Sequence, residues 1–333
     1  TWTAAGTLSI DAALAAEIAS TPADFYVNVH TTAATAGLVR NQLAPLGARE
    51  VHATLLGANE VVVADADARG AATFLFGAGK SVAFRLAMSS PASADLTAAH
   101  IHAAPAGVDG PVLVDLDPTA ATLDPTTGLI SGTLTLSLEQ IARIGNALPQ
   151  FYVNAHTAAV PAGVARGQLT DEPVQFWATL SADNETTPPT DLNGRGGAAL
   201  ELDSFSSGVA HLAVPPTQGI GSISDAHVHA APAGSDGGVV MDLTSGADYT
   251  ESILSFSSEG SVTCDQDLFT RLLANPAAFY FNFHTSADPG GAVRGQLTQE
   301  PVGFFAVLDG SEEVPVADPT ASALGQVVVS SMS

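Results

Sequence analysis

The sequence predicts an all-β protein made of tandem antiparallel Greek-key sandwich or barrel repeats, each with one short helix. Three observations lead to this fold class. The 333 residues include 31 Gly and 20 Pro, a composition that favours many short strands joined by turns. Short apolar runs alternate with Pro, Gly and Asp-Gly turn signals. The same phrases return about every 125 residues, which is typical of a repeat architecture.

Three phrases define the repeat. The first reads Phe-Tyr-x-Asn-x-His-Thr and begins at Phe25, Phe151 and Phe279. Each copy is followed by an Arg-x-Gln-Leu phrase, with its arginine at Arg40, Arg166 and Arg294. The second phrase, Ala-His-x-His-Ala-Ala-Pro-Ala-Gly, occurs at residues 99–107 and 226–234 and leads into Asp-Gly. The third is an opening phrase that ends in an aligned glutamate, at Glu60, Glu185 and Glu313.

These phrases divide the chain into two complete repeats, 47–172 and 173–300. Residues 1–46 match only the second part of a repeat, and residues 301–333 match only its opening. Together the two end segments lack the stretch that corresponds to 81–126. We therefore expect either that the chain is part of a longer array of repeats or that neighbouring copies supply the missing stretch.

Within one repeat, strands are expected at 112–116, 134–136, 151–156 and 164–169, and seven to eight strands are expected in all. The helix is expected after Ser137, which forms a capping box with Gln140 and precedes apolar residues at helical spacing. Asp11 and Asp265 occupy the aligned cap position in the other copies. A hairpin about the Pro-Ala-Gly turn is expected to place Asn154 opposite Arg166 and Tyr152 opposite Gln168. The predicted result is a polar outer face.

Charge and cysteine content exclude several classes of protein. Ten Lys and Arg against 34 Asp and Glu give a net charge of −24, which argues against binding to nucleic acid or to an anionic membrane surface. The single cysteine, Cys264, excludes a disulfide within the chain and cysteine-based zinc sites.

No apolar run is long enough to span a membrane. A signal peptide is missing, so the start at Thr1 is expected to be processed or truncated. An acidic, lysine-poor surface favours a secreted protein at the cell surface or outside it, and a salt-adapted cytoplasmic protein is the alternative.

Seven of the nine histidines belong to the His-x-His phrase or to the Phe-Tyr-x-Asn-x-His-Thr phrase, and only His52 and His211 lie elsewhere. Because side chains alternate along a strand, His100 and His102 share one face while Ile101 points to the other. A His-x-His pair joined by a third histidine is a ligand set that copper(II) or zinc accepts. The predicted metal ligands are His100, His102 and His156 in the first repeat, and His227, His229 and His284 in the second. The alternative is a structural network in which these imidazoles bond to Asn, Thr, Tyr and Glu.

Catalytic residues and an organic cofactor site are not expected. No nucleophile elbow and no catalytic cysteine context is present. The aligned glutamates are expected to cap turns or to pair with arginine, and the aligned arginines to pair with a carboxylate or carbonyl of their own repeat. No phosphate-binding loop precedes a helix, and the calcium-loop pattern is absent.

Taken together, the three phrases resemble the chordin-type CHRD domain over nearly the whole chain. The resemblance implies an extracellular protein with an immunoglobulin-like or Greek-key fold. The His-x-His strand is also similar to that of the copper-zinc superoxide dismutases, which implies a metal site at His100 and His102 or at His227 and His229. The disulfide, bridging histidine and electrostatic-loop arginine of those enzymes are not identifiable here. In the first copy Asn41 replaces the motif glycine, and His30 has no visible partner pair.

The sequence thus predicts a non-enzymatic, extracellular structural or adhesive repeat protein that associates with further copies or repeats. Residues 301–333 of one copy could add strands to residues 1–46 of the next, which would build a filament from head to tail. The alternative function is a copper- or zinc-binding redox or metal-storage protein of the dismutase type.

Overall fold

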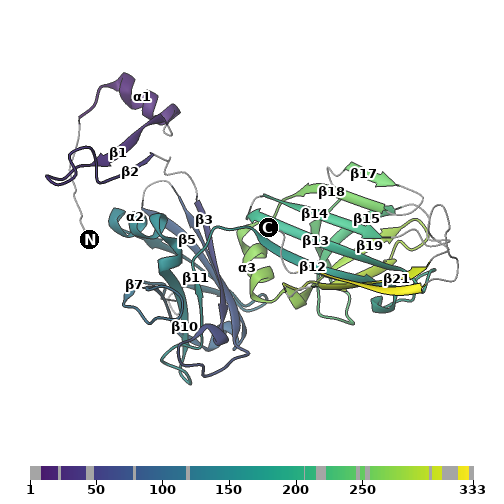
Figure 1. The fold of residues 1–333 in the computed structure, drawn as a ribbon. Coiled ribbons are helices and arrows are strands. Elements are labelled where there is room, and N and C mark those ends of the chain that lie inside the picture. Colours follow the sequence, from purple (N-terminus) through teal and green to yellow (C-terminus); the bar gives the residue numbers. More distant parts are fainter. Residues whose placement is uncertain are drawn as a thin grey trace.

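The computed structural model describes residues 9–21, 24–42, 49–77, 80–117, 121–205, 207–214, 223–244, 248–251, 256–299, 302–309 and 322–329. Strands dominate this part of the chain, and its three α-helices are short. Two large antiparallel sheets of nine strands each follow one another along the chain and curl into half-barrels (Figure 1). The predicted all-β class is therefore confirmed.

The first sheet has the strand order β7-β6-β10-β11-β3-β4-β5-β9-β8. Its strands are β3 (Arg49–Leu56), β4 (Arg69–Phe76), β5 (Ser81–Ser90), β6 (Leu96–Ala103), β7 (Val112–Asp115), β8 (Thr122–Asp124), β9 (Leu129–Thr135), β10 (Phe151–Thr157) and β11 (Ala165–Gln168). The prediction of seven to eight strands is too low. One reason is that β8 has three exposed residues and thus no apolar pattern that would reveal it.

The second sheet repeats this order as β16-β15-β19-β20-β12-β13-β14-β18-β17. Its strands are β12 (Val174–Ser181), β13 (Arg195–Ser204), β14 (Ser207–Val214), β15 (Ile223–Ala230), β16 (Gly238–Asp242), β17 (Asp248–Glu251), β18 (Phe256–Val262), β19 (Phe279–Thr285) and β20 (Val293–Gln296). Equivalent phrases of the sequence therefore form equivalent strands. The exact limits of the repeats stay a prediction.

Side-chain alternation separates a core face from a polar face in each sheet. Val153 of β10 and Ile101 of β6 lie in the core of the first repeat, while Tyr152 and Asn154 point to the opposite face. The predicted register is confirmed, because Asn154 pairs with Arg166. The prediction that this face is an outer one is wrong, since the Arg166 side chain is only 2% exposed. Loops around residues 57–68, 104–111 and 158–163 cover the polar face and bond to its side chains.

The three helices are α1 (Ala12–Ser20), α2 (Leu138–Asn146) and α3 (Gln266–Ala274). The predicted caps are confirmed. Ser137 and Gln140 form the capping box of α2, and Asp11 and Asp265 accept hydrogen bonds from the first turns of α1 and α3.

Helix α3 joins the two repeats, a contact that the repeated phrases of the sequence do not predict. It belongs to the second repeat, yet it packs on β4 and β5 of the first and lies between the two sheets (Figure 1). The hydroxyl groups of Thr73 and Thr270 are 2.7 Å apart and buried. The ring of His52 meets Phe269 edge to face at 5.4 Å between centroids. Arg85 forms an ion pair with Asp267 at 2.5 Å.

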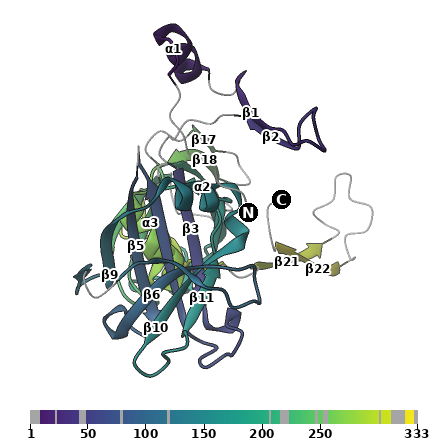
Figure 2. The ribbon, with the colours of Figure 1, turned by 90° about the vertical axis from the view of Figure 1, so that its left-hand side faces the viewer.

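Two smaller hairpins flank the large sheets in sequence. Strands β1 (Tyr26–Val29) and β2 (Val39–Gln42) form one, and β21 (Val302–Asp309) and β22 (Ser322–Val329) form the other. In both ribbon views α1 and the β1–β2 hairpin stand away from the large sheets, and from β21–β22 (Figures 1 and 2).

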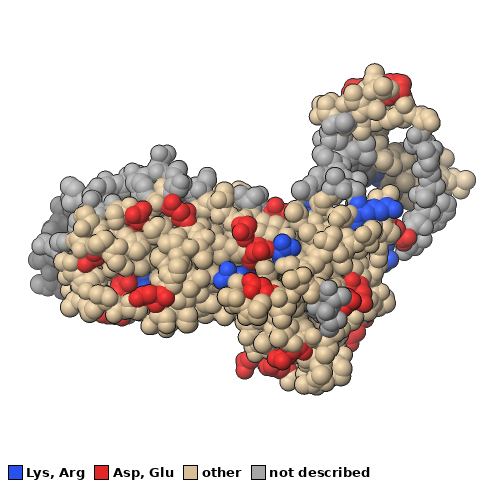
Figure 3. All heavy atoms as spheres, turned by 180° about the vertical axis from the view of Figure 1, so that it is seen from behind, with Lys and Arg blue, Asp and Glu red and all other residues tan. Residues whose placement is uncertain are grey.

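Acidic side chains are spread over the visible surface in Figure 3, with few basic ones between them. This distribution agrees with the net charge of −24, and the described residues on this face form no large basic patch of the kind that binds nucleic acid. Among the described helices, none has the length and apolar character that a membrane-spanning segment requires.

Candidate metal centre

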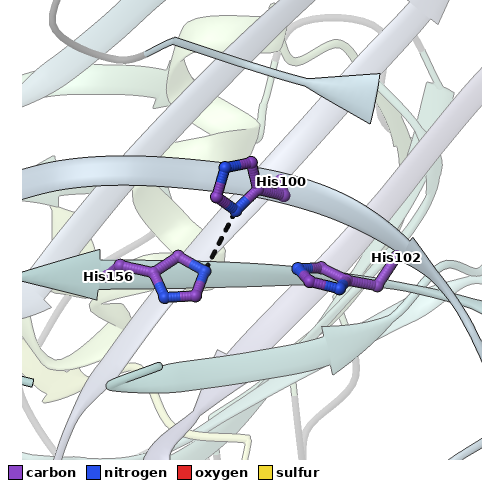
Figure 4. Close-up of side chains that lie close together, drawn as sticks. All are labelled: His100, His102 and His156. Carbon is purple, nitrogen blue, oxygen red and sulfur yellow. Dashed lines mark hydrogen bonds between the residues drawn. The ribbon is translucent and has the colours of Figure 1, made fainter. Parts of the chain in front are cut away.

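The polar face of each sheet brings three histidines together. In the first repeat, β6 supplies His100 and His102, and the neighbouring antiparallel strand β10 supplies His156. The rings of His100 and His156 point toward one another, with His102 beside them (Figure 4). Strands β15 and β19 place His227, His229 and His284 in the same way in the second repeat.

The three ring nitrogens of each group lie within 4.8 Å of one another. In the first repeat, Nδ1 of His100 is 3.1 Å from Nε2 of His156. Three ligand nitrogens on one tetrahedral zinc ion, at 2.0–2.1 Å each, stand about 3.4 Å apart. The spacing of the imidazoles is thus close to that of a three-nitrogen metal site.

Hydrogen bonds from the rings to backbone carbonyls determine which nitrogens face the centre. Nδ1 of His102 is 2.9 Å from the carbonyl oxygen of Gly110, and Nδ1 of His156 is 3.1 Å from that of Pro161. Because a carbonyl oxygen only accepts, Nδ1 of each ring carries the proton and Nε2 keeps a free electron pair. This is the usual way in which proteins orient metal-binding histidines.

The second repeat has the same bonds at the same lengths. Nδ1 of His229 donates to the carbonyl of Gly237 at 2.9 Å, and Nδ1 of His284 donates to that of Pro289 at 3.1 Å. The neutral tautomer is therefore the same in both copies.

Several of the nitrogens that face the centres are buried without a hydrogen-bond partner. They are Nε2 of His102, Nδ1 of His227, Nε2 of His229 and Nε2 of His284. A buried polar atom left unpaired costs free energy. These unpaired atoms belong to the two groups of three histidines.

Electrostatics favour the neutral form of two of the three histidines at each centre. Burial lowers the pKa of His102 and His156 in the first repeat, and the neighbouring histidines lower it further. The pKa of His229 and of His284 is lowered by burial and by His227. A neutral imidazole is the form that binds a metal ion, so no proton has to be removed at neutral pH.

A stack of aromatic and arginine side chains packs against each group of three histidines. The ring of Tyr152 lies parallel to that of His102 at 4.9 Å, and the guanidinium of Arg166 lies 4.9 Å from the centroid of the same tyrosine ring. Arg166 bonds to Asp109 at 2.9 Å and lies 4.0 Å from Glu60. Burial raises the pKa of Glu60 to about 7, although Arg166 and its positive charge oppose the shift.

The equivalent stack of the second repeat consists of His229, Tyr280 and Arg294. Arg294 pairs with Asp236 at 2.9 Å and with Glu185 at 3.5 Å. The prediction that the aligned arginines and glutamates pair within their repeat is therefore confirmed for both complete copies. Glu313 lies outside the described residues.

Three imidazole nitrogens with no described side chain in a fourth position suit zinc or copper(II). His30, the equivalent of His156 in the N-terminal segment, makes the same type of bond, from Nδ1 to the carbonyl of Thr35 at 2.9 Å. It belongs to no group of three ligands in the part of the chain that the structure describes.

Sequence reasoning missed the carbonyl groups that orient the rings. Gly110 and Gly237 belong to the Asp-Gly pair that follows each His-x-His phrase, so a signal was present. That pair reads as a turn, however, and its contact with a histidine eight residues earlier depends on how the loop folds back over the sheet.

The repeated phrases correspond to a known family. The model of the CHRD domain matches residues 51–169 and again 176–297, which together make up well over half of the chain. The chain belongs to the CHRD-domain family. A search among curated proteins finds no match. Each CHRD domain contains one complete group of three histidines.

Proposed function

We propose that this tandem CHRD protein is an extracellular structural or adhesive protein in which each complete repeat holds one copper or zinc ion on three histidines. One observation carries the proposal. Imidazole nitrogens oriented by backbone carbonyls, and in part left unpaired, converge in both repeats.

One ion held by the three nitrogens crosslinks two neighbouring strands and stabilises the folded repeat. The residues around the group do the positioning. Gly110 and Pro161 hold the tautomers of His102 and His156, and Tyr152 covers one face of His102. Among the described residues, the hydrogen bonds of these rings go to backbone carbonyls and to each other. We therefore assign a structural role to the three histidines.

The extracellular assignment is supported by the CHRD family, the acidic surface and the low lysine content. Self-association is part of the proposal. Copies associate from head to tail, and strands of residues 301–333 of one copy complete those of residues 1–46 of the next.

A metal-dependent redox or metal-storage protein is the second candidate. It is favoured by the position at each centre that no described side chain fills, which is where a small ligand binds in catalytic metal sites. Activity with superoxide in the copper-loaded protein tests the redox form of this second candidate, because a structural site predicts none.

Metal analysis of protein purified without chelator tests the main proposal. We expect two ions per chain, one for each group. His102→Ala and His229→Ala should each lower the content to one, whereas His211→Ala, outside both groups, should leave it unchanged. A metal content near zero, with no difference between wild type and His102→Ala, would contradict the proposal.

A further inference from the structure

We infer that Asp225 gives the histidine group of the second repeat the higher metal affinity of the two, because it adds a negative charge that the first group does not have. The inference rests on the proposed metal binding. It makes two groups with the same three ligands unequal in their affinity for one divalent ion.

The strand register places Asp225 beside a predicted ligand. Asp225 lies on β15, directly opposite His284 of β19. Directly opposed residues of an antiparallel pair share one face of the sheet, and their Cβ atoms lie about 4.5–5.5 Å apart. Because side chains alternate along a strand, Asp225 also shares this face with His227 and His229.

The carboxylate of Asp225 stands at the rim of the group. The side chain is exposed, and the ligand atoms that lie within 4.8 Å of one another are those of the three histidines. We therefore assign Asp225 a role through its charge and not as a ligand.

The first repeat has an uncharged residue at this position. Ala98 lies opposite His156, as Asp225 lies opposite His284. Burial and the neighbouring histidines lower the pKa of both ligands, but Asp225 is among the groups that raise the pKa of His284, whereas the group that raises that of His156 is the carbonyl of Pro161. A charge that favours the positive form of His284 also favours a metal ion held at the same ring.

Other carboxylates near the two groups come in equivalent pairs. Asp115 and Asp242 occupy equivalent positions on the edge strands β7 and β16. Asp109 and Asp236 each form an ion pair with the aligned arginine of their repeat. These pairs act in the same way on both groups and do not make them different.

Asp288 is a second acidic residue that the first repeat lacks, since Val160 is its counterpart. Its Oδ1 accepts hydrogen bonds from the backbone N–H and the hydroxyl group of Thr190, both at 2.7 Å. Its charge acts on Glu185, whose pKa is raised to about 7 mainly by burial. Asp225 differs from Asp288 because it acts on a histidine of the group itself.

The expected effect is modest because Asp225 is exposed to solvent. Water and salt weaken the attraction between exposed charges, although a divalent ion doubles the attraction that a single charge would feel. We expect the second group to bind zinc about 3- to 10-fold more tightly than the first at low ionic strength. The difference should shrink at about 1 M salt, where the Debye length is about 3 Å.

Full-length chains with one intact group allow each affinity to be measured separately. His229→Ala leaves the first group intact, and His102→Ala leaves the second. Calorimetric titration with zinc alone, at low and at high salt, gives the two dissociation constants.

Three further substitutions test the charge. In the His102→Ala chain, Asp225→Asn removes the charge at nearly constant size and should weaken zinc binding about 3- to 10-fold. Asp203→Asn is the control, because Asp203 is exposed on β13 of the same sheet, with β19, β20 and β12 between it and β15. It should leave the affinity unchanged. Ala98→Asp in the His229→Ala chain should strengthen binding by a similar factor, and it adds the charge of Asp225 without that of Asp288.

The outcomes separate this inference from the proposed metal binding. Zinc bound by neither group would overturn both. Zinc bound with equal affinity by the two groups would leave the proposed metal binding standing and overturn the role of Asp225. A difference that Asp225→Asn does not reduce, or that is undiminished at high salt, would overturn that role as well.

Discussion

Nδ1 of His229 lies 2.9 Å from the carbonyl oxygen of Gly237, a hydrogen bond that leaves Nε2 of the same ring directed at the other two histidines of its group. The close approach of this loop to the backbone of Ala230 accounts for the glycine. A Cβ atom at Gly237 would lie 2.2 Å from the carbonyl oxygen of Ala230, so the loop would have to shift.

The neighbouring glycine provides a matched test of this bond. Gly237→Ala should weaken metal binding in the second repeat about 10- to 100-fold, as is typical when the groups that orient metal ligands are disturbed. Gly238→Ala should have no effect, because a Cβ atom at Gly238 meets nothing within 4 Å. Titration of each variant with zinc, followed by calorimetry, measures the difference. Equal affinities for the two variants would show that the carbonyl of Gly237 does not orient the ligand.

The contact between the repeats should depend on Phe269. This side chain is fully buried between α3 and the sheet of the first repeat. Phe269→Ala leaves a cavity and should lower the free energy of unfolding by about 3–5 kcal/mol. Ile141→Ala changes the equivalent position of α2, which is half-buried, and should cost about 1–2 kcal/mol.

Differential scanning calorimetry checks both variants. In Phe269→Ala the transitions of the two repeats should also separate, because the helix that couples them is loosened. A single unchanged transition in Phe269→Ala would show that α3 does not join the repeats energetically.

Acid should destabilise the protein partly through His52. Burial lowers the pKa of this histidine from 6.5 to about 4 in the folded state. Between these values the unfolded chain binds a proton that the folded chain does not, so unfolding becomes more favourable as the pH falls from 6.5 to 4. The contribution that is lost amounts to about 2–3 kcal/mol.

Replacing His52 with an aromatic residue that does not titrate isolates this contribution. His52→Phe keeps a ring against Phe269, and the second repeat already has Trp177 at the equivalent position. Urea unfolding at pH 7 and at pH 4 should show a smaller loss of stability in the variant than in wild type. An identical loss in both proteins would mean that His52 does not titrate in this range.

The sequence predicts the histidine face well because strand geometry is local. Alternation places His100 and His102 on one side and Ile101 on the other, and the hairpin about the Pro-Ala-Gly turn sets Asn154 opposite Arg166. The alternation follows from the two-residue period of a strand, and the register follows from the length of the turn. The same reasoning wrongly predicts that the polar face around Arg166 is an outer one. The loops that cover Arg166 lie far from it in the chain.

The role of α3 was also beyond local reasoning, although the helix differs visibly from its counterpart. Apolar residues in α3 cover more than one face and include Phe269 and Leu273, where α2 has Ile141 and Gly145. A helix with two apolar faces has two neighbours. The periodicity of apolar residues in α3 does not predict that the second neighbour is the sheet of the preceding repeat.

The most direct test of the central claim is an anomalous difference map from crystals grown with zinc or copper and measured at the absorption edge of the metal. We expect one peak in each repeat, at about 2.0–2.1 Å from the three facing nitrogens, namely Nδ1 of His100, Nε2 of His102 and Nε2 of His156 in the first. A map with no peak at either group of histidines, under conditions that saturate such sites, would contradict the account.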